Sequence, residues 1–64
     1  MEITRVSMFS GIKRTKIIDI TQEQYNNWLN GKNIQDVAPH LSPSDREFII
    51  TGVTDEEWQA EFND

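Results

Sequence analysis

Apolar and polar side chains alternate through much of the first twenty residues, and β-branched residues predominate there. Alternation with this composition is typical of β-strands. Ser10 and Gly11 separate two such runs, and a glycine supplies the positive φ that a tight hairpin turn requires. The pattern therefore predicts a two-stranded antiparallel β-hairpin over residues 1–20.

A turn at these two residues sets the expected register of the hairpin. Val6 then lies opposite Thr15, and Ile3 lies opposite Ile18. One face of the hairpin is mainly apolar but is interrupted by three cations, namely Arg5, Arg14 and Lys16. Because neither face is entirely apolar, the hydrophobic pattern specifies the register weakly.

The spacing of apolar residues changes from two to three and four after the predicted hairpin. Thr21 and Gln24 form the pattern of a capping box, in which each side chain bonds the other residue's backbone N–H. Tyr25, Trp28 and Leu29 then share one helical face. We therefore expect a helix to begin directly after Thr21.

Further helix signals follow to the end of the chain. Residues 33–38 predict a short helix, and residues 42–45 provide a serine cap, a proline at the first helical position and an acid at the third. This helix should end near Gly52, where glycine favours a stop. Residues 54–57 form another capping box and begin a last, acidic helix.

The order of elements predicts an α+β fold, with an N-terminal two-stranded antiparallel β-hairpin packed on three to four short α-helices. Residues 1–64 form a single domain, with the hairpin over 1–20 and the helical part over 21–64. The expected core combines apolar side chains of both parts: Ile3, Val6, Ile18, Ile20, Tyr25, Trp28, Leu29, Val37, Leu41, Phe48, Ile49, Trp58 and Phe62. Because the core is this small and the strand edges are half-apolar, we expect the chain to self-associate, as a dimer joined through the hairpins.

The composition narrows the setting in which the chain acts. It contains no cysteine, which excludes disulfides and thiolate metal sites and is compatible with a reducing compartment. No stretch approaches the roughly 20 apolar residues that span a bilayer, and no early stretch is typical of a secretory signal. We therefore expect a cytoplasmic protein without membrane contact.

Charge is distributed unevenly along the chain. Residues 1–20 carry four basic and two acidic side chains, whereas residues 21–64 carry two basic and nine acidic ones. The formal net charge is −5. An acidic surface repels phosphate backbones and attracts basic protein surfaces, so the balance favours a protein partner.

The sequence offers little material for catalysis. His40 is the single histidine and is most simply a loop residue between Pro39 and the Ser42 cap. General acid–base catalysis needs a positioned partner in a pocket, and no pattern supplies one. The chain also lacks a glycine-rich phosphate loop and a calcium-binding loop. We expect no enzyme, no cofactor and no metal site.

Two binding functions remain. The first is protein binding through the exposed aromatic residue of the hairpin turn and the acidic C-terminal segment, with the candidate interface Phe9, Asp55, Glu56, Glu57 and Glu61. The alternative is nucleic-acid binding through a basic hairpin, with the candidate contacts Arg5, Lys13, Arg14 and Lys16. Four cations give only modest affinity, and the acidic remainder opposes it, so protein binding is favoured.

The chain also carries several short motifs: Gln24-Tyr25, Trp28 with Gly31, Ile34-Gln35, Leu41-Ser42, Asp45-Arg46-Glu47-Phe48, Thr51-Gly52 and Glu56-Glu57-Trp58. In these it resembles short uncharacterised proteins encoded by tailed phages and prophages. The resemblance implies action in an infected bacterial cytoplasm, where small acidic proteins of this kind engage a host enzyme or assist takeover or counter-defence. The expected partner is a host or phage protein. It assigns no activity to any residue.

Overall fold

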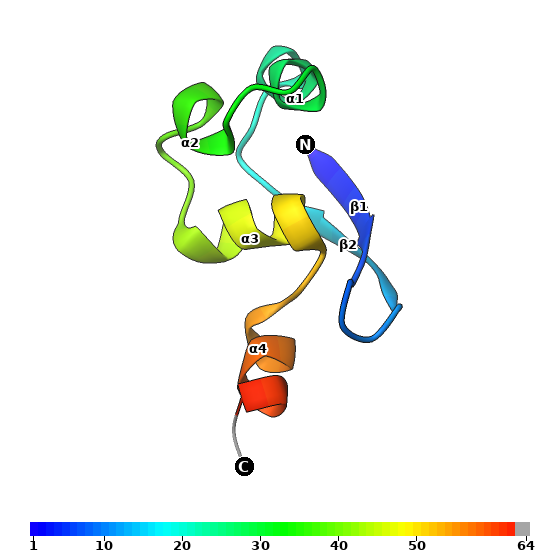
Figure 1. The fold of residues 1–64 in the computed structure, drawn as a ribbon. Helices are drawn as coiled ribbons and strands as arrows, with labels where there is room; N and C mark the ends of the chain where they lie inside the picture. The colour runs from blue at the N-terminus through cyan, green and yellow to red at the C-terminus, as the bar shows by residue number, and fades with distance from the viewer. Residues whose placement is uncertain (63–64) are drawn as a thin grey trace.

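The computed structural model describes the backbone of residues 1–62 and the side chains of residues 1–61. The elements, in chain order, are β1 (Glu2–Val6), β2 (Lys13–Ile17), α1 (Gln22–Leu29), α2 (Ile34–Val37), α3 (Pro43–Thr51) and α4 (Asp55–Phe62). The fold is α+β with an antiparallel hairpin, as the sequence predicts. It is elongated, at 38 × 19 × 19 Å, with α1 and α2 at one end and α4 at the other (Figure 1).

The hairpin has a different register from the predicted one. Val6 pairs with Lys13 and Ile3 with Lys16, so the pairing is displaced by two residues. The cause is a longer loop, because the hydrogen bond from Ser7 N–H to the Ile12 carbonyl closes the ladder before the expected turn. A displacement of two preserves the alternation of side chains, so each residue remains on its predicted face.

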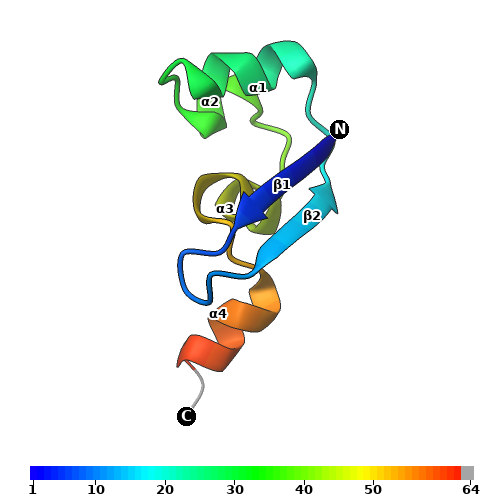
Figure 2. The same cartoon turned by 90° about the vertical axis from the view of Figure 1, so that its right-hand side faces the viewer.

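The two faces of the hairpin differ in what covers them. The inner face contains Ile3, which is buried, and faces α3, which packs against β1 (Figure 2). The outer face is uncovered and includes Ile17, which is 78% exposed, and Val6, which is 56% exposed. The prediction that Val6 belongs to the core is therefore wrong, because its position in the alternation directs it outward.

Two helices begin where the capping patterns predict. The Thr21 hydroxyl accepts from Gln24 N–H at 3.1 Å, and the Gln24 side chain accepts from Thr21 N–H at 3.0 Å. Ser42 caps α3 by accepting from Asp45 N–H, and Pro43 occupies the first turn. These side chains satisfy backbone donors that a helix start otherwise leaves unpaired.

The helix α3 supplies the centre of the core through Phe48 and Ile49, which are almost fully buried. Around them lie buried residues of β1, of α2 and of the connections that follow β2 and α2: Ile3, Ile18, Ile20, Ile34, Ala38 and Leu41. Tyr25, Trp28 and Val37 pack at the margin. Leu29 was expected in this core but is exposed, because α1 directs Tyr25 and Trp28 toward it and ends at Leu29.

Two further differences, and one position that is not described, concern the predicted core. Ile34, Ala38 and Val53 are buried, although the sequence did not place them there. Trp58 is only half-buried and lies on α4, outside the main cluster. The predicted core position of the Phe62 side chain lies outside the described residues.

Candidate functional site

Two cations of the hairpin's inner face, Arg14 and Lys16, pair with acids of the last two helices. Arg14 forms an ion pair with Glu57 of α4. Lys16 forms one with Asp45 of α3, with 2.8 Å between Nζ and Oδ1, and its ammonium lies 5.8 Å from the Phe48 ring centre. These pairs help to explain how helices can cover a charged face, since the two cations receive counter-charges from those helices.

Arg5 is also directed toward the helical part of the fold. Its guanidinium lies 5.6 Å from the centre of the Trp28 ring, and one of its N–H groups donates to the Ile50 carbonyl at 3.3 Å. The Nε atom is buried and has no hydrogen-bond partner. The contact with the indole face supplies a cation–π attraction in place of an ion pair.

The four proposed nucleic-acid contacts are therefore not gathered on one surface. Arg5, Arg14 and Lys16 are half-buried on the inner face, where the helices contact them. Lys13 is exposed and lies on the outer face, beside Val6. A groove-reading ribbon requires its cations on one accessible face, and this hairpin does not present them so.

Glu57 connects α4 to the hairpin loop. One carboxylate oxygen accepts a 2.7 Å hydrogen bond from the Ser7 hydroxyl, and the other pairs with Arg14. The Ser7 oxygen in turn accepts from the backbone N–H groups of Phe9 and Ser10. The Glu57 side chain is only 12% exposed, so this acid is engaged within the fold rather than available to a partner.

Phe9 brings the hairpin loop against the last helix. Its ring lies edge-on to the Trp58 ring, with 5.0 Å between the centroids and 80° between the planes. Edge-to-face geometry of this kind is favourable for aromatic pairs. Phe9 remains 39% exposed. The fold therefore unites the predicted interface residue of the loop with the acidic helix, which lies more than forty residues later in the chain.

The remaining acids of the predicted interface differ in how far they are engaged. Asp55 accepts from the Ser44 hydroxyl at 2.8 and 2.7 Å through its two oxygens. Glu56 and Glu61 are exposed, and their carboxylates form no hydrogen bond or ion pair in the part of the chain that the structure describes. These two acids are therefore available to an external partner.

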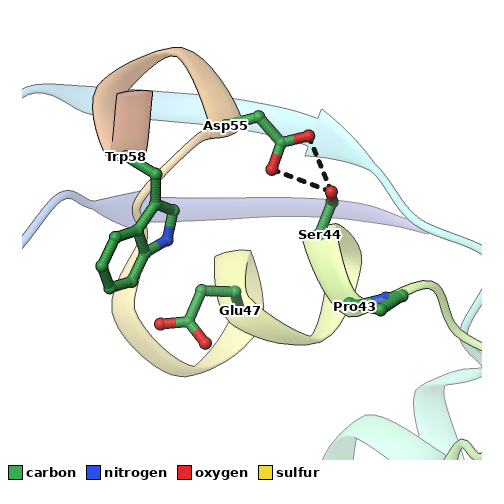
Figure 3. A pocket seen from close by; sticks show the side chains of 5 residues that line it. All are labelled: Pro43, Ser44, Glu47, Asp55 and Trp58. Carbon is green, nitrogen blue, oxygen red and sulfur yellow. Dashed lines mark hydrogen bonds between the residues drawn. The ribbon is translucent and has the colours of Figure 1, made fainter. Parts of the chain in front are cut away.

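A pocket of about 260 Å³ lies between α3 and α4. It is lined by Pro43, Ser44, Glu47, Asp55 and Trp58. Figure 3 shows Glu47 extending from α3 and the Trp58 indole from α4 into the same region, next to the bond between Ser44 and Asp55. The Glu47 carboxylate is half-buried and forms no hydrogen bond or ion pair with any described residue.

This pocket was not predicted from the sequence. Ser44 was interpreted only as a helix-start residue, and Trp58 as a core residue. The pocket exists because the connection at Gly52, which adopts a left-handed φ of 77°, brings the start of α4 beside the start of α3. A capping pattern predicts where each helix begins but does not predict which two helix starts will adjoin.

His40 lies away from this pocket and forms a local contact. Its Nε2 atom is within hydrogen-bond distance of the Asp19 carbonyl oxygen and 3.9 Å from the Asp19 carboxylate. The ring is exposed, and no hydroxyl group bonds it among the described residues. His40 therefore connects the loop before α3 to the segment that follows β2.

Two further observations on the described residues concern metal ligands and membrane spans. Residues 1–62 contain no group of three or more potential metal-ligating side chains. None of the helices in the same range has the length and apolar character needed to cross a membrane.

Comparison with known proteins gives no independent indication of function, since no protein-family model, curated protein or solved structure was significantly similar to the chain.

Proposed function

We propose that this domain binds a basic surface of a protein partner through an acidic surface formed by α3 and α4. The observation that carries this proposal is the internal use of the hairpin cations. Arg14 and Lys16 are paired with Glu57 and Asp45. Among the described residues, the carboxylates of the last two helices that form no hydrogen bond or ion pair belong to Glu47, Glu56 and Glu61.

The electrostatic argument concerns both attraction and selectivity. A net charge of −5 on 64 residues attracts basic protein surfaces over several ångströms and speeds their encounter. Charge alone is not specific, but the acidic surface adjoins two aromatic side chains, Phe9 and Trp58. Partly exposed aromatic residues bounded by polar ones are typical of binding hot spots.

The resemblance to phage and prophage proteins adds a setting to this proposal. In that setting, the partner is a bacterial protein of the host cytoplasm, and binding inhibits or modulates it. The nucleic-acid alternative receives less support, because three of its four proposed cations are directed toward the helices. The proposal therefore concerns a protein partner alone.

Affinity capture with paired charge reversals tests the proposal. The test variant, Glu56→Lys with Glu61→Lys, reverses two exposed acids of α4. The control, Glu23→Lys with Asp36→Lys, makes the same charge change on α1 and α2, at the other end of the molecule (Figure 1). Glu23 and Asp36 lie in first helical turns, as Glu56 does, whereas Glu61 lies in the last turn of α4, where a lysine is favourable to the helix dipole. Weaker capture by the test variant is therefore not a consequence of a greater loss of helix-dipole stabilisation.

We expect wild type and control to recover one protein from bacterial lysate in a saturable manner. The test variant should recover several-fold less, because it places cations against a basic surface. Circular dichroism of each variant establishes that it is folded. Equal recovery by test and control variants, or no saturable protein with the wild type, contradicts the proposal.

A further inference from the structure

The pocket between α3 and α4 has the size and position of a site for one side chain. Its volume of about 260 Å³ is below the range of roughly 300–1,000 Å³ that is common for sites of drug-sized ligands and cofactors. It opens beside the Phe9–Trp58 pair, within the surface to which protein binding is assigned above. A protruding side chain of a partner protein fits this size and this place.

The charges of the lining residues determine the sign of the charge that a bound side chain should carry. Glu47 and Asp55 contribute two carboxylates, and none of the lining residues is basic. The Ser44 hydroxyl orients the Asp55 carboxylate by donating to it. This hydrogen bond uses only part of the capacity of the carboxylate to accept hydrogen bonds. Glu47 is half-buried without any described partner for its carboxylate. The complementary occupant is therefore a cation that donates several hydrogen bonds.

The walls of the pocket distinguish between the possible cations. Trp58 supplies a flat indole surface and Pro43 an apolar ring. A guanidinium is planar, is less strongly hydrated than an ammonium, and stacks on aromatic rings while its N–H groups meet carboxylates in the plane. A metal ion is a poorer match, because no group of three ligating side chains exists in residues 1–62.

We infer that this pocket binds an arginine side chain of the partner protein. The inference rests on the proposed function, and it names the chemical group that the acidic surface recognises. The guanidinium lies against the Trp58 ring, and its N–H groups donate to the carboxylates of Glu47 and Asp55. Pro43, on the opposite side of the pocket from the indole (Figure 3), offers an apolar contact to the aliphatic part of the arginine.

Nuclear magnetic resonance of the ¹⁵N-labelled protein tests this inference with three short peptides. The probes are acetyl-Gly-Arg-Gly-amide and the same peptide with lysine or citrulline in the central position. Citrulline keeps the shape of arginine but is uncharged. We expect the arginine peptide to shift the amide signals of residues 44–47 and 55–58 and the indole signal of Trp58. The lysine peptide should bind several-fold more weakly, and the citrulline peptide should produce no shift.

A matched pair of variants separates the pocket from general charge attraction. Glu47→Gln removes one charge inside the pocket, and Glu23→Gln removes one charge at an exposed position of α1, outside the pocket lining and outside the proposed binding surface. Glu47→Gln should weaken arginine-peptide binding by about two- to fivefold, the range for a partly exposed ion pair. Glu23→Gln should leave it nearly unchanged.

Three results overturn the inference: shifts spread over the whole surface, equal shifts with arginine and citrulline, or equal weakening by the two variants. The capture experiment keeps this failure distinct from failure of the proposed function. Loss of the peptide preference while capture still depends on Glu56 and Glu61 removes the arginine site alone. Absence of any saturable protein partner removes the proposed function itself.

Discussion

The Ser7 hydroxyl donates a 2.7 Å hydrogen bond to Glu57, a residue fifty positions later in the chain. Ser7 is 2% exposed and also receives two loop N–H groups, so its oxygen organises the hairpin loop and attaches α4 to it. The same Glu57 carboxylate neutralises Arg14. The position of the acidic helix beside the hairpin therefore depends on this buried polar contact.

Replacement of Glu57 should destabilise the fold more than replacement of its neighbour. Glu57→Ala leaves the buried Ser7 hydroxyl without its acceptor and Arg14 without its counter-charge. We expect the free energy of unfolding to fall by about 1–3 kcal/mol, the cost of an unsatisfied buried polar group. Urea unfolding followed by circular dichroism measures it. Glu56→Ala, at an exposed position, should change it by less than about 0.5 kcal/mol.

A double-mutant cycle isolates the contact itself. Ser7→Ala, Glu57→Ala and the double variant should show a coupling energy of at least about 0.5 kcal/mol, because residues in direct contact are non-additive. Additive losses would show that the hydrogen bond between Ser7 and Glu57 contributes nothing measurable, and that each side chain stabilises the protein through its other contacts.

Two glycines allow backbone strain to be separated from steric exclusion. Gly31 and Gly52 both have positive φ, at 98° and 77°. A Cβ on Gly31 meets nothing within 4 Å, whereas one on Gly52 lies 2.5 Å from the Val6 carbonyl oxygen. Alanine at position 31 should cost about 1–2 kcal/mol through left-handed strain alone. Gly52→Ala should cost at least about 1 kcal/mol more, because β1 must also move.

Thermal or urea unfolding of both alanine variants provides the comparison. The structure requires the larger loss at Gly52, where the chain passes from α3 to α4 directly beside β1. Equal losses at the two positions would mean that this connection does not lie against the strand, and the pocket between α3 and α4 would lose its structural basis.

Much of the fold was predictable because its signals are local. The helix starts at Thr21 and Ser42 follow from side chains that bond amides three residues away. The hairpin and its two faces follow from alternation, which a register shift of two does not disturb. The register itself was not predictable, because the loop is closed by Ser7, whose buried oxygen depends on Glu57 at the far end of the chain.

The candidate site shows the same division. Phe9 and the acidic residues were proposed as an interface from their type and position, and the fold brings Phe9 against Trp58 of the acidic helix. The contacts of Glu57 with Ser7 and Arg14 were not predicted, since a row of acids does not reveal which one faces inward. The opposite charges of the two halves of the chain contained a signal for this pairing, because buried cations on one half require acids from the other.

We predict that the protein does not bind nucleic acid. Titration of labelled single-stranded and double-stranded oligonucleotides at low salt should give no saturable change in fluorescence polarisation. The reason is that Arg14 and Lys16 are already paired and the surrounding surface is acidic. This prediction is contradicted if the protein binds oligonucleotides in a salt-sensitive manner and loses that binding when alanine replaces Arg5, Lys13, Arg14 and Lys16.

Self-association through the hairpin provides the last prediction. The outer face of β1 and β2 is uncovered and carries Val6 and Ile17, both largely exposed. A two-stranded sheet is marginal alone, and an apolar face of this kind is stabilised when a second copy covers it. Light scattering after size-exclusion chromatography should therefore give twice the mass of the chain at high concentration.

Substitution on the same face checks where the copies meet. Ile17→Lys should restore the mass of one chain, because two copies would oppose like charges across the outer face. Leu29→Lys makes the same change at an exposed apolar position on α1 and should leave the larger mass unchanged. A wild-type protein that stays at the mass of one chain at every concentration contradicts association. If neither lysine changes the larger mass, the two copies meet away from the hairpin, and the uncovered strands serve only as a charged, unpaired edge.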